Sequence, residues 1–426
     1  MDLSTIPARV DRIKISGLKR TKDDYVQRAA HNLFKAKSFK ELTEETNATL
    51  VNLTELGIFK YIHAQIDVSK GDKATPNGYE ITFIGEELKR VTGAVGTEIG
   101  HNEGSLKVEL NAPNIAGRGE RVGASALYSN AKATDINVRF SKPFYHTKLH
   151  QYKPEASFTL FKRSASYPWS KYNTNDCGAL FEYSFLLPTA VRHSLQYEWA
   201  IREIGAMEKH VPFFVRENCG PRLASVLRHI GSYDKRDSKI FPTYGVYVNM
   251  TNELSGLGGN ISYIKNETHG EINVPLFGNV SAQLTGRVGI IQSDKNAQSI
   301  PLSNMFILGG PLNVRGFLTG GIGDHVGGAS VGAQTFWASG LHIWSPLPFN
   351  RHFGMLSDHM RIHFFSTLGN VNSFNLNNYR CSVGCGLAFR IGGRARIELN
   401  YCKPIHRQGT DVGKEGFQFG IGCEFL

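Results

Sequence analysis

The chain has 426 residues, of which 41% are hydrophobic, and its 48 Lys and Arg against 37 Asp and Glu give a formal net charge of +11. This much apolar material excludes a disordered chain. The lack of any run of about 18 apolar residues excludes transmembrane helices, but not a membrane β-barrel, whose strands alternate. The 45 glycines and 11% aromatic residues indicate tight turns and long strands.

Charge and cysteine content exclude several classes of function. The Lys and Arg residues are scattered and no nucleic-acid-binding motif is present, so no nucleic acid is expected as a partner. The six cysteines contain no C-x-x-C pair and are too sparse for a disulfide framework, which favours a reducing compartment. The first residues have neither an apolar h-region nor an Arg-rich amphipathic stretch, so no secretory or transit peptide is expected.

Residues 1–90 are predicted to form a small α+β domain. Apolar spacing predicts a strand, two helices and two strands, at residues 10–15, 24–34, 39–56, 62–68 and 79–83. The second helix begins with the capping box Ser38-Phe-Lys-Glu41 and ends at Gly57. The resulting order is β-α-α-β-β, with an exposed sheet edge and no catalytic cluster.

Residues 91–426 are predicted to be all-β. Alternation of apolar and polar residues recurs throughout, as in Leu195–Ile201 and Ile397–Tyr401. At about 20 residues for each strand with its connection, this part holds about 16 antiparallel strands. Alternation alone does not separate a soluble sandwich from a membrane barrel. Connections after odd-numbered strands include the long segments 203–221 and 293–330, whereas others are short turns, and this sorting favours a transmembrane barrel.

Motifs with catalytic or ligand-binding precedents lack the surroundings they need. Gly328-Ala-Ser-Val-Gly332 matches a nucleophile elbow but follows a glycine-rich loop instead of joining a strand to a helix. Gly321–Gly327 has no following Lys-Ser or Lys-Thr and no helix, as a phosphate loop requires. We therefore expect no enzyme activity, no catalytic residue, no metal and no cofactor.

The most informative segment is the tip Val314-Arg-Gly-Phe317 inside the long loop 293–330. Gly316 permits a tight turn, and Phe317 can anchor the loop in an apolar site. If the loop enters the barrel lumen, Arg315 needs a carboxylate partner, because an unpaired buried charge is costly.

This tip, following a β-α-α-β-β module, resembles the BamA-type superfamily of outer-membrane assembly and secretion barrels, in which the module is called a POTRA domain. A single such module, together with Gly104-Ser-Leu-Lys-Val-Glu-Leu110 and Leu399-Asn-Tyr-Cys-Lys-Pro404, is similar to the core barrel subunits of the mitochondrial sorting and assembly machinery (SAM complex). The resemblance implies insertion and folding of β-barrel precursor proteins in the mitochondrial outer membrane. It also implies contact with membrane lipid and metaxin-like peripheral SAM subunits, with the POTRA domain facing the intermembrane space.

One position departs from the bacterial relatives. They carry F-x-D-x-G on a late strand, where the Asp can hold the loop arginine, whereas Phe365-Ser-Thr-Leu-Gly369 has Thr367 at that position. From the alternation of faces, Glu398 points inward and is nominated as the partner of Arg315, with Glu424 behind it.

The end of the chain carries a second signal. Lys414, Gly416, Phe419 and Ile421 fit the polar-x-Gly-x-x-hydrophobic-x-hydrophobic β-signal that mitochondrial barrel precursors carry in their last strand. The match implies that this chain is itself inserted as a barrel.

The first and last strands are predicted to form a weak seam that acts as a lateral gate. Both are rich in glycine, which weakens a strand ladder. The gate residues are Val91, Gly93, Val95, Gly96 and Gly100 on the first strand and Gly416, Phe417, Phe419, Gly420 and Gly422 on the last. A client strand could pair with the opened edge. Two alternatives stay open: a pore of the same superfamily that translocates a polypeptide past Glu182 and Glu198, and a soluble β-rich binding protein.

Overall fold

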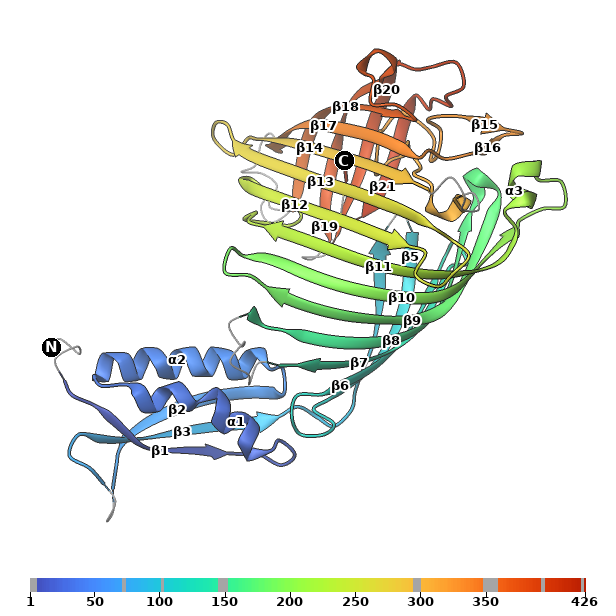
Figure 1. The fold of residues 1–426 in the computed structure, drawn as a ribbon. Helices are drawn as coiled ribbons and strands as arrows, with labels where there is room; N and C mark the ends of the chain where they lie inside the picture. Colours follow the sequence, from blue (N-terminus) through green and yellow to red (C-terminus); the bar gives the residue numbers. More distant parts are fainter. Residues whose placement is uncertain are drawn as a thin grey trace.

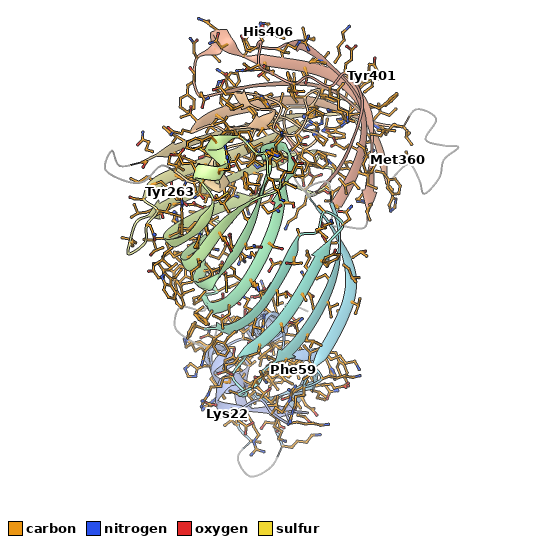
Figure 2. All side chains as sticks on the ribbon, turned by 90° about the vertical axis from the view of Figure 1, so that its right-hand side faces the viewer. Lys22, Phe59, Tyr263, Met360, Tyr401 and His406 are labelled. Carbon is orange, nitrogen blue, oxygen red and sulfur yellow. The ribbon has the colours of Figure 1, made fainter. Side chains whose placement is uncertain are left out.

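The computed structural model describes residues 6–70, 74–100, 103–144, 152–293, 300–347, 359–391, 395–422 and 425–426. They form an N-terminal module, residues 6–90, and one large antiparallel sheet (Figure 1). None of the helices in these residues is long and apolar enough to cross a membrane. Figure 2 shows the module, marked by Lys22 and Phe59, at the opposite end of the molecule from His406.

The N-terminal module has the predicted element order. Its elements are β1 (Arg9–Ser16), α1 (Asp23–Ala29), a 3-10 helix (His31–Lys35), α2 (Phe39–Glu55), β2 (Phe59–Val68) and β3 (Gly78–Glu87). β3 is the central strand, parallel to β1 and antiparallel to β2. The backbone amide of Glu41 donates to Ser38 Oγ, as in the predicted cap. The first helix is shorter than expected and continues as the 3-10 helix, with Leu33 fully buried.

The large sheet has 16 strands, each paired with its neighbour in chain order apart from two short strands in a loop. The strands up to that loop are β4 (Thr92–Gly100), β5 (Glu103–Pro113), β6 (Arg121–Ser129), β7 (Thr134–Pro143), β8 (Glu155–Tyr167), β9 (Tyr172–Leu186), β10 (Val191–Ala206), β11 (Gly220–Asp234), β12 (Gly245–Ser255), β13 (Tyr263–Pro275) and β14 (Ser281–Gln292). Those after it are β17 (Thr335–Pro346), β18 (Met360–Val371), β19 (Arg380–Ile391), β20 (Ala395–His406) and β21 (Gly416–Gly422).

The connections sort by length less cleanly than the sequence suggested. The connection between β10 and β11 is long and contains α3 (Phe213–Glu217), and that between β14 and β17 contains the two-stranded β15 (His325–Val326) and β16 (Ala329–Ser330). However, two long connections follow strands at even positions in the sheet: 144–154 comes after its fourth strand, β7, and 235–244 comes after its eighth strand, β11. The first of these adjoins the module, where Lys153 Nζ lies 2.7 Å from Glu55 Oε1.

Two apolar cores organise the molecule. One lies between the helices and the sheet of the N-terminal module. The other forms where the loop after β14 packs on inward-facing residues of the large sheet; its loop members are Ile300, Phe306, Leu308, Val314, Phe317, Ile322 and Ala333. The long loop therefore packs against the inner face of the large sheet.

The module is tied to the turn between β5 and β6. Asn114 Nδ2 donates to Thr21 Oγ1 (2.7 Å), and Arg121 Nη2 donates to the carbonyl of Leu56. Arg118 forms an ion pair with Asp24. These contacts fix one end of the sheet against the module.

Candidate functional site: a buried arginine and an unpaired sheet edge

The tip Val314–Phe317 requires glycine for two reasons. Gly316 has φ +80°, a left-handed conformation that residues with a side chain rarely adopt. A Cβ at Gly316 would also lie 3.0 Å from Ser382 Cβ on the inner face of β19. Val314 and Phe317 are fully buried and anchor the tip on either side.

The side chain of Arg315 is fully buried. Its Nη2 donates to Glu398 Oε2 on β20 (2.8 Å), and its Nη1 donates to the carbonyl oxygen of Leu426 (2.8 Å). The guanidinium also lies 4.9 Å from the centre of the Phe365 ring and 5.6 Å from that of Phe425. A carboxylate, a carbonyl and two aromatic faces thus compensate a charge removed from water.

Glu398 serves two arginines. Arg396 Nε lies 2.8 Å from Glu398 Oε1, and the two atoms form an ion pair without a hydrogen bond between them. Asn400 Nδ2 donates to Glu398 Oε2 (2.9 Å). We call Arg315, Arg396, Glu398, Asn400 and the Leu426 carbonyl the Arg315 cluster. Glu398 thus contacts both arginines, and the Leu426 oxygen and the nearby aromatic rings also face Arg315.

Two stacked histidines link Asn400 to the Leu426 carbonyl on one side of the Arg315 cluster. His363 Nε2 lies 2.7 Å from Asn400 Oδ1, and His342 Nε2 lies 2.9 Å from the Leu426 carbonyl oxygen. The two rings are stacked at 5.7 Å between centres, and Trp344 stacks on His363 at 4.2 Å. The site is therefore held by side chains from β17, β18 and β20 as well as by the loop.

Thr367 has a different role from the aspartate of the F-x-D-x-G pattern. It is fully buried, and its Oγ1 lies 2.8 Å from Ser382 Oγ, directly beneath Gly316. The carboxylate that holds Arg315 comes from β20 instead. Phe365, in the same pattern, contributes an aromatic face to Arg315.

The loop tip is also bound to the last strand. Gln418 of β21 accepts from the backbone amide of Gly316 and donates to the carbonyl of Phe317, both at 2.9 Å. The backbone amide of Lys414 donates to the carbonyl of Gly316 (2.8 Å). β21 is therefore fastened to the loop through side chain and backbone.

β4 and β21 are the edges of the 16-stranded sheet. Some of their Cα atoms lie within 8 Å of each other, yet in the described part of the chain the sheet pairs β4 only with β5 and β21 only with β20. Every residue from Val91 to Thr97 is exposed, whichever face it points to, whereas Gln418 is 4% exposed. The two edges thus differ: β21 is covered from inside, and β4 is not covered over residues 92–97.

The predicted site residues fall into three places. Of the tip Val314–Phe317, Arg315 contacts Glu398 as predicted, whereas Glu424 lies outside the described residues. The predicted gate residues lie on or beside β4 and β21, with Phe417 and Phe419 exposed on the outward face. β21 spans Gly416–Gly422. Residues 423–424 lie outside the described residues, and Phe425 is buried, with its ring centre 4.3 Å from the Arg396 guanidinium.

Several residues of the site were missed from the sequence. Arg396 and Asn400 share the inward face of Glu398 on β20, and Gln418 is an inward polar residue of the last strand, so alternation could have identified them. The proximity of His342, His363 and Leu426 to this site was not predictable in the same way, because it depends on pairing across four strands and on where the last residues of the chain lie.

The comparisons with known proteins agree with one another. Residues 114–425 match the Omp85 superfamily domain. The whole chain is 49% identical to a SAM50-like protein of Drosophila melanogaster, covering 96% of that relative. Over 98% of its length it is 35% identical to the sorting and assembly machinery component 50 homolog of Homo sapiens, covering 90% of that protein. The solved structure of BamA from Haemophilus ducreyi lacking POTRA domains 1–3 has the same fold, with a TM-score of 0.81 at 18% identity over 97% of this chain and 84% of that chain.

Proposed function

The chain belongs to the Omp85 superfamily, and from this premise we propose that it inserts and folds β-barrel precursor proteins in the mitochondrial outer membrane. Clients enter the bilayer through a lateral gate between β4 and β21. The names of the relatives describe a component of a sorting and assembly machinery, which supports a role in protein assembly.

The observation that carries this proposal is the inequality of the two sheet edges. β21 is held by Gln418 and by the backbone of Lys414, whereas β4 has β5 as its ladder partner and is exposed on both faces over residues 92–97. An unpaired sheet edge in the bilayer leaves backbone N–H and C=O groups without hydrogen-bond partners. In hydrocarbon this costs on the order of several kcal/mol for each group. A client strand that pairs with β4 removes this cost.

The Arg315 cluster fixes the β21 side of the gate. Arg315 binds Glu398 on β20 and the carbonyl of Leu426, which follows β21. In the proposed mechanism this loop keeps β21 in place while β4 separates from it. No covalent step is required, because the client exchanges one set of backbone hydrogen bonds for another.

The N-terminal module acts as a POTRA domain in the intermembrane space. The edges of its sheet, β1 and β2, are able to accept an extended segment of a client. Metaxin-like subunits and membrane lipid are the proposed partners of the barrel. Hydrogen bonds hold the module against the turn 114–120, and this contact supports a fixed path for a client from the module to the seam between β4 and β21.

A disulfide across the seam tests the gate. Cysteine pairs are screened along β4 and β21 in a cysteine-free chain, and the locked protein is assayed for client insertion into vesicles. Val95→Cys with Val108→Cys is the matched control, because these residues face each other on β4 and β5 within the sheet. The proposal predicts that only the seam disulfide blocks insertion, and that reduction restores it. Normal insertion by the locked protein would contradict the proposal.

A further inference from the structure

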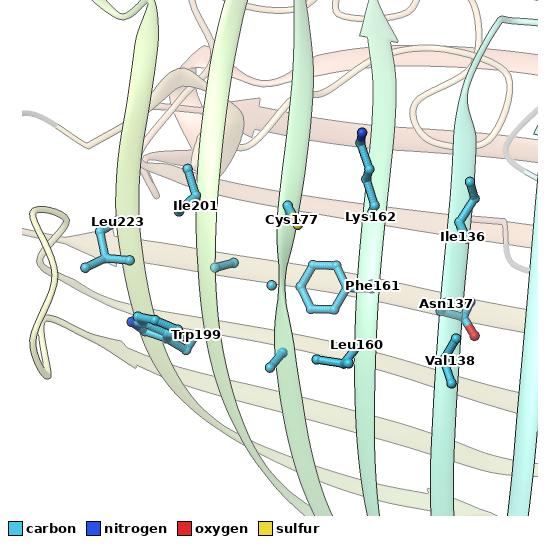
Figure 3. Close-up of a pocket in the computed structure, with 13 residues that line it drawn as sticks. Ile136, Asn137, Val138, Leu160, Phe161, Lys162, Cys177, Trp199, Ile201 and Leu223 are labelled. Atoms are coloured by element: carbon cyan, nitrogen blue, oxygen red, sulfur yellow. The ribbon is translucent and has the colours of Figure 1, made fainter.

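A groove runs over the outward face of the sheet between β7 and β11 (Figure 3). Its volume is about 530 Å³. The groove arises from side-chain size: β9 carries Cys177 and Ala179 there, between Leu160 of β8 and Trp199 of β10. The small residues of β9 form its floor and the larger residues of its neighbours form its walls.

The groove ends at a single cation. Lys162 of β8 is exposed on the outward face and lies in one row of the sheet with Ile136, Cys177 and Ile201. Within the ranges that the structure describes, no hydrogen bond or ion pair of its amino group is found. In Figure 3 this group extends along β8, away from Leu160.

The next row of the sheet is polar. Thr134, Ser164, Asn175 and Glu203 follow one another across β7, β8, β9 and β10. Below Lys162, the outward residues of β8 are Leu160 and Phe158, both exposed and apolar. A lysine on the lipid face is costly at the bilayer midplane and costs little at the interface. The change from apolar to polar rows therefore puts Lys162 at the edge of the apolar belt.

We propose that this groove is a binding site for an anionic phospholipid. The amino group of Lys162 binds the headgroup phosphate, and an acyl chain lies along β9 over Cys177 and Ala179. Charge complementarity selects an anionic lipid over a zwitterionic one, and the stem of the lysine can reach the headgroup level. Glu203, two strands away in the polar row, is the nearest outward carboxylate on β10 and does not face the groove floor. The inference rests on the membrane location proposed above.

The test uses the full chain inserted into vesicles of phosphatidylcholine with or without phosphatidylglycerol, followed by mild detergent extraction and native mass spectrometry of retained lipid. Flotation measures insertion separately. Lys162→Gln is predicted to lower retained phosphatidylglycerol about fivefold, the effect of one basic residue near the membrane surface. Ala179→Leu, which fills the groove and leaves the lysine, is predicted to lower it as well. Lys40→Gln, an exposed lysine on α2, is the control and retains as much as the unsubstituted chain.

Three results would overturn the site. These are equal retention of phosphatidylglycerol by Lys162→Gln, no effect of Ala179→Leu, or displacement of the lipid by inorganic phosphate, which would indicate a phosphate site without lipid. If the unsubstituted chain failed to float with vesicles, the membrane function and the lipid site would both be wrong. If it floated and bound both lipids equally, the lipid site alone would be wrong.

Discussion

At the scale of single residues, the buried ion pair between Arg315 and Glu398 has unequal partners. Removal of Glu398 takes from both Arg315 and Arg396 the side-chain carboxylate that they share, whereas removal of Arg315 leaves Glu398 paired with Arg396. Loss of one partner of a buried pair costs about 3–5 kcal/mol when the remaining charge has no other partner. Glu398 is therefore the more sensitive position.

We predict that Glu398→Gln lowers the free energy of unfolding by about 3–5 kcal/mol, and Arg315→Met by less. The double variant is predicted to lose less than the sum, with a coupling of about 0.5–3 kcal/mol, measured by urea unfolding. Glu182→Gln is the control, since its pair with Arg139 is partly exposed and is expected to contribute less than about 1 kcal/mol. A charge swap is a poorer test, because an arginine at position 398 would face Arg396.

A second residue-scale prediction concerns Glu87, which joins β3 to residues 19–21. The carboxylate accepts from the amides of Lys19, Arg20 and Thr21 and from the Thr21 hydroxyl. Burial alone would raise the pKa of Glu87, but these hydrogen bonds outweigh burial and lower it from 4.5 to about 2. Because the pKa is lowered in the folded state, the stabilisation is complete above about pH 4.5 and is lost as the pH falls toward about 2.

Hydrogen exchange of these three amides, corrected for intrinsic rates, measures the effect. Protection is expected to decrease between about pH 5 and about pH 3 in the full chain. In Glu87→Gln, protection is expected to be low at both pH values and to change little between them. An unchanged protection pattern in Glu87→Gln would show that the carboxylate does not hold this segment.

Arg315 and its partner Glu398 were predictable from the sequence, whereas several of the side chains around them were not. Alternation put Glu398 on the inward face of β20, which required only the local period of the strand. The contact of His342 with Leu426 at the same site depends on strand register across the sheet and on the position of Leu426, and local patterns contain no information about either.

At the scale of elements, glycines of the large sheet differ in how much space surrounds them. A Cβ at Gly96 of β4 would meet nothing within 4 Å, whereas a Cβ at Gly386 of β19 would collide with Asn400 Oδ1 and lie 2.7 Å from the Leu399 carbonyl oxygen. Gly96 weakens the edge without a steric need, and Gly386 leaves room for the Arg315 cluster.

We predict that Gly96→Ala leaves the barrel folded and raises its stability by up to about 1 kcal/mol, because alanine loses less backbone entropy. Gly386→Ala is predicted to destabilise by about 1–3 kcal/mol through displacement of Asn400 from Glu398. Urea unfolding of both variants checks the difference. Equal effects of the two substitutions would contradict the distinction between an open and a packed glycine.

Element order was largely predictable, and element ends were not. The order β-α-α-β-β and the 16 strands follow from apolar spacing, and both are present. The division of the first helix at Ala30 depends on tertiary packing. Leu33 packs into the module core, so contacts distant in sequence override the local pattern.

At the scale of the whole molecule, the first and last strands of the sheet lie close together but differ in what covers them. Composition suggested that both would be weak, because both contain glycine. In the structure, the long loop after β14 binds β21, and no described residue of that loop covers β4. This asymmetry makes β4 the edge that a client would meet in the proposed mechanism.

Site-specific crosslinking of an arrested β-barrel precursor tests this claim most directly. Single cysteines are placed in a cysteine-free chain at Val91 beside β4, at Gly93 and Val95 on β4, and at the inward-facing Glu182 and Glu198. The gate account predicts crosslinks from the last strand of the precursor to β4, in a register that shifts by one residue of the precursor for each residue of β4. Crosslinks to Glu182 and Glu198 with none to β4 would contradict it and would favour a translocation pore.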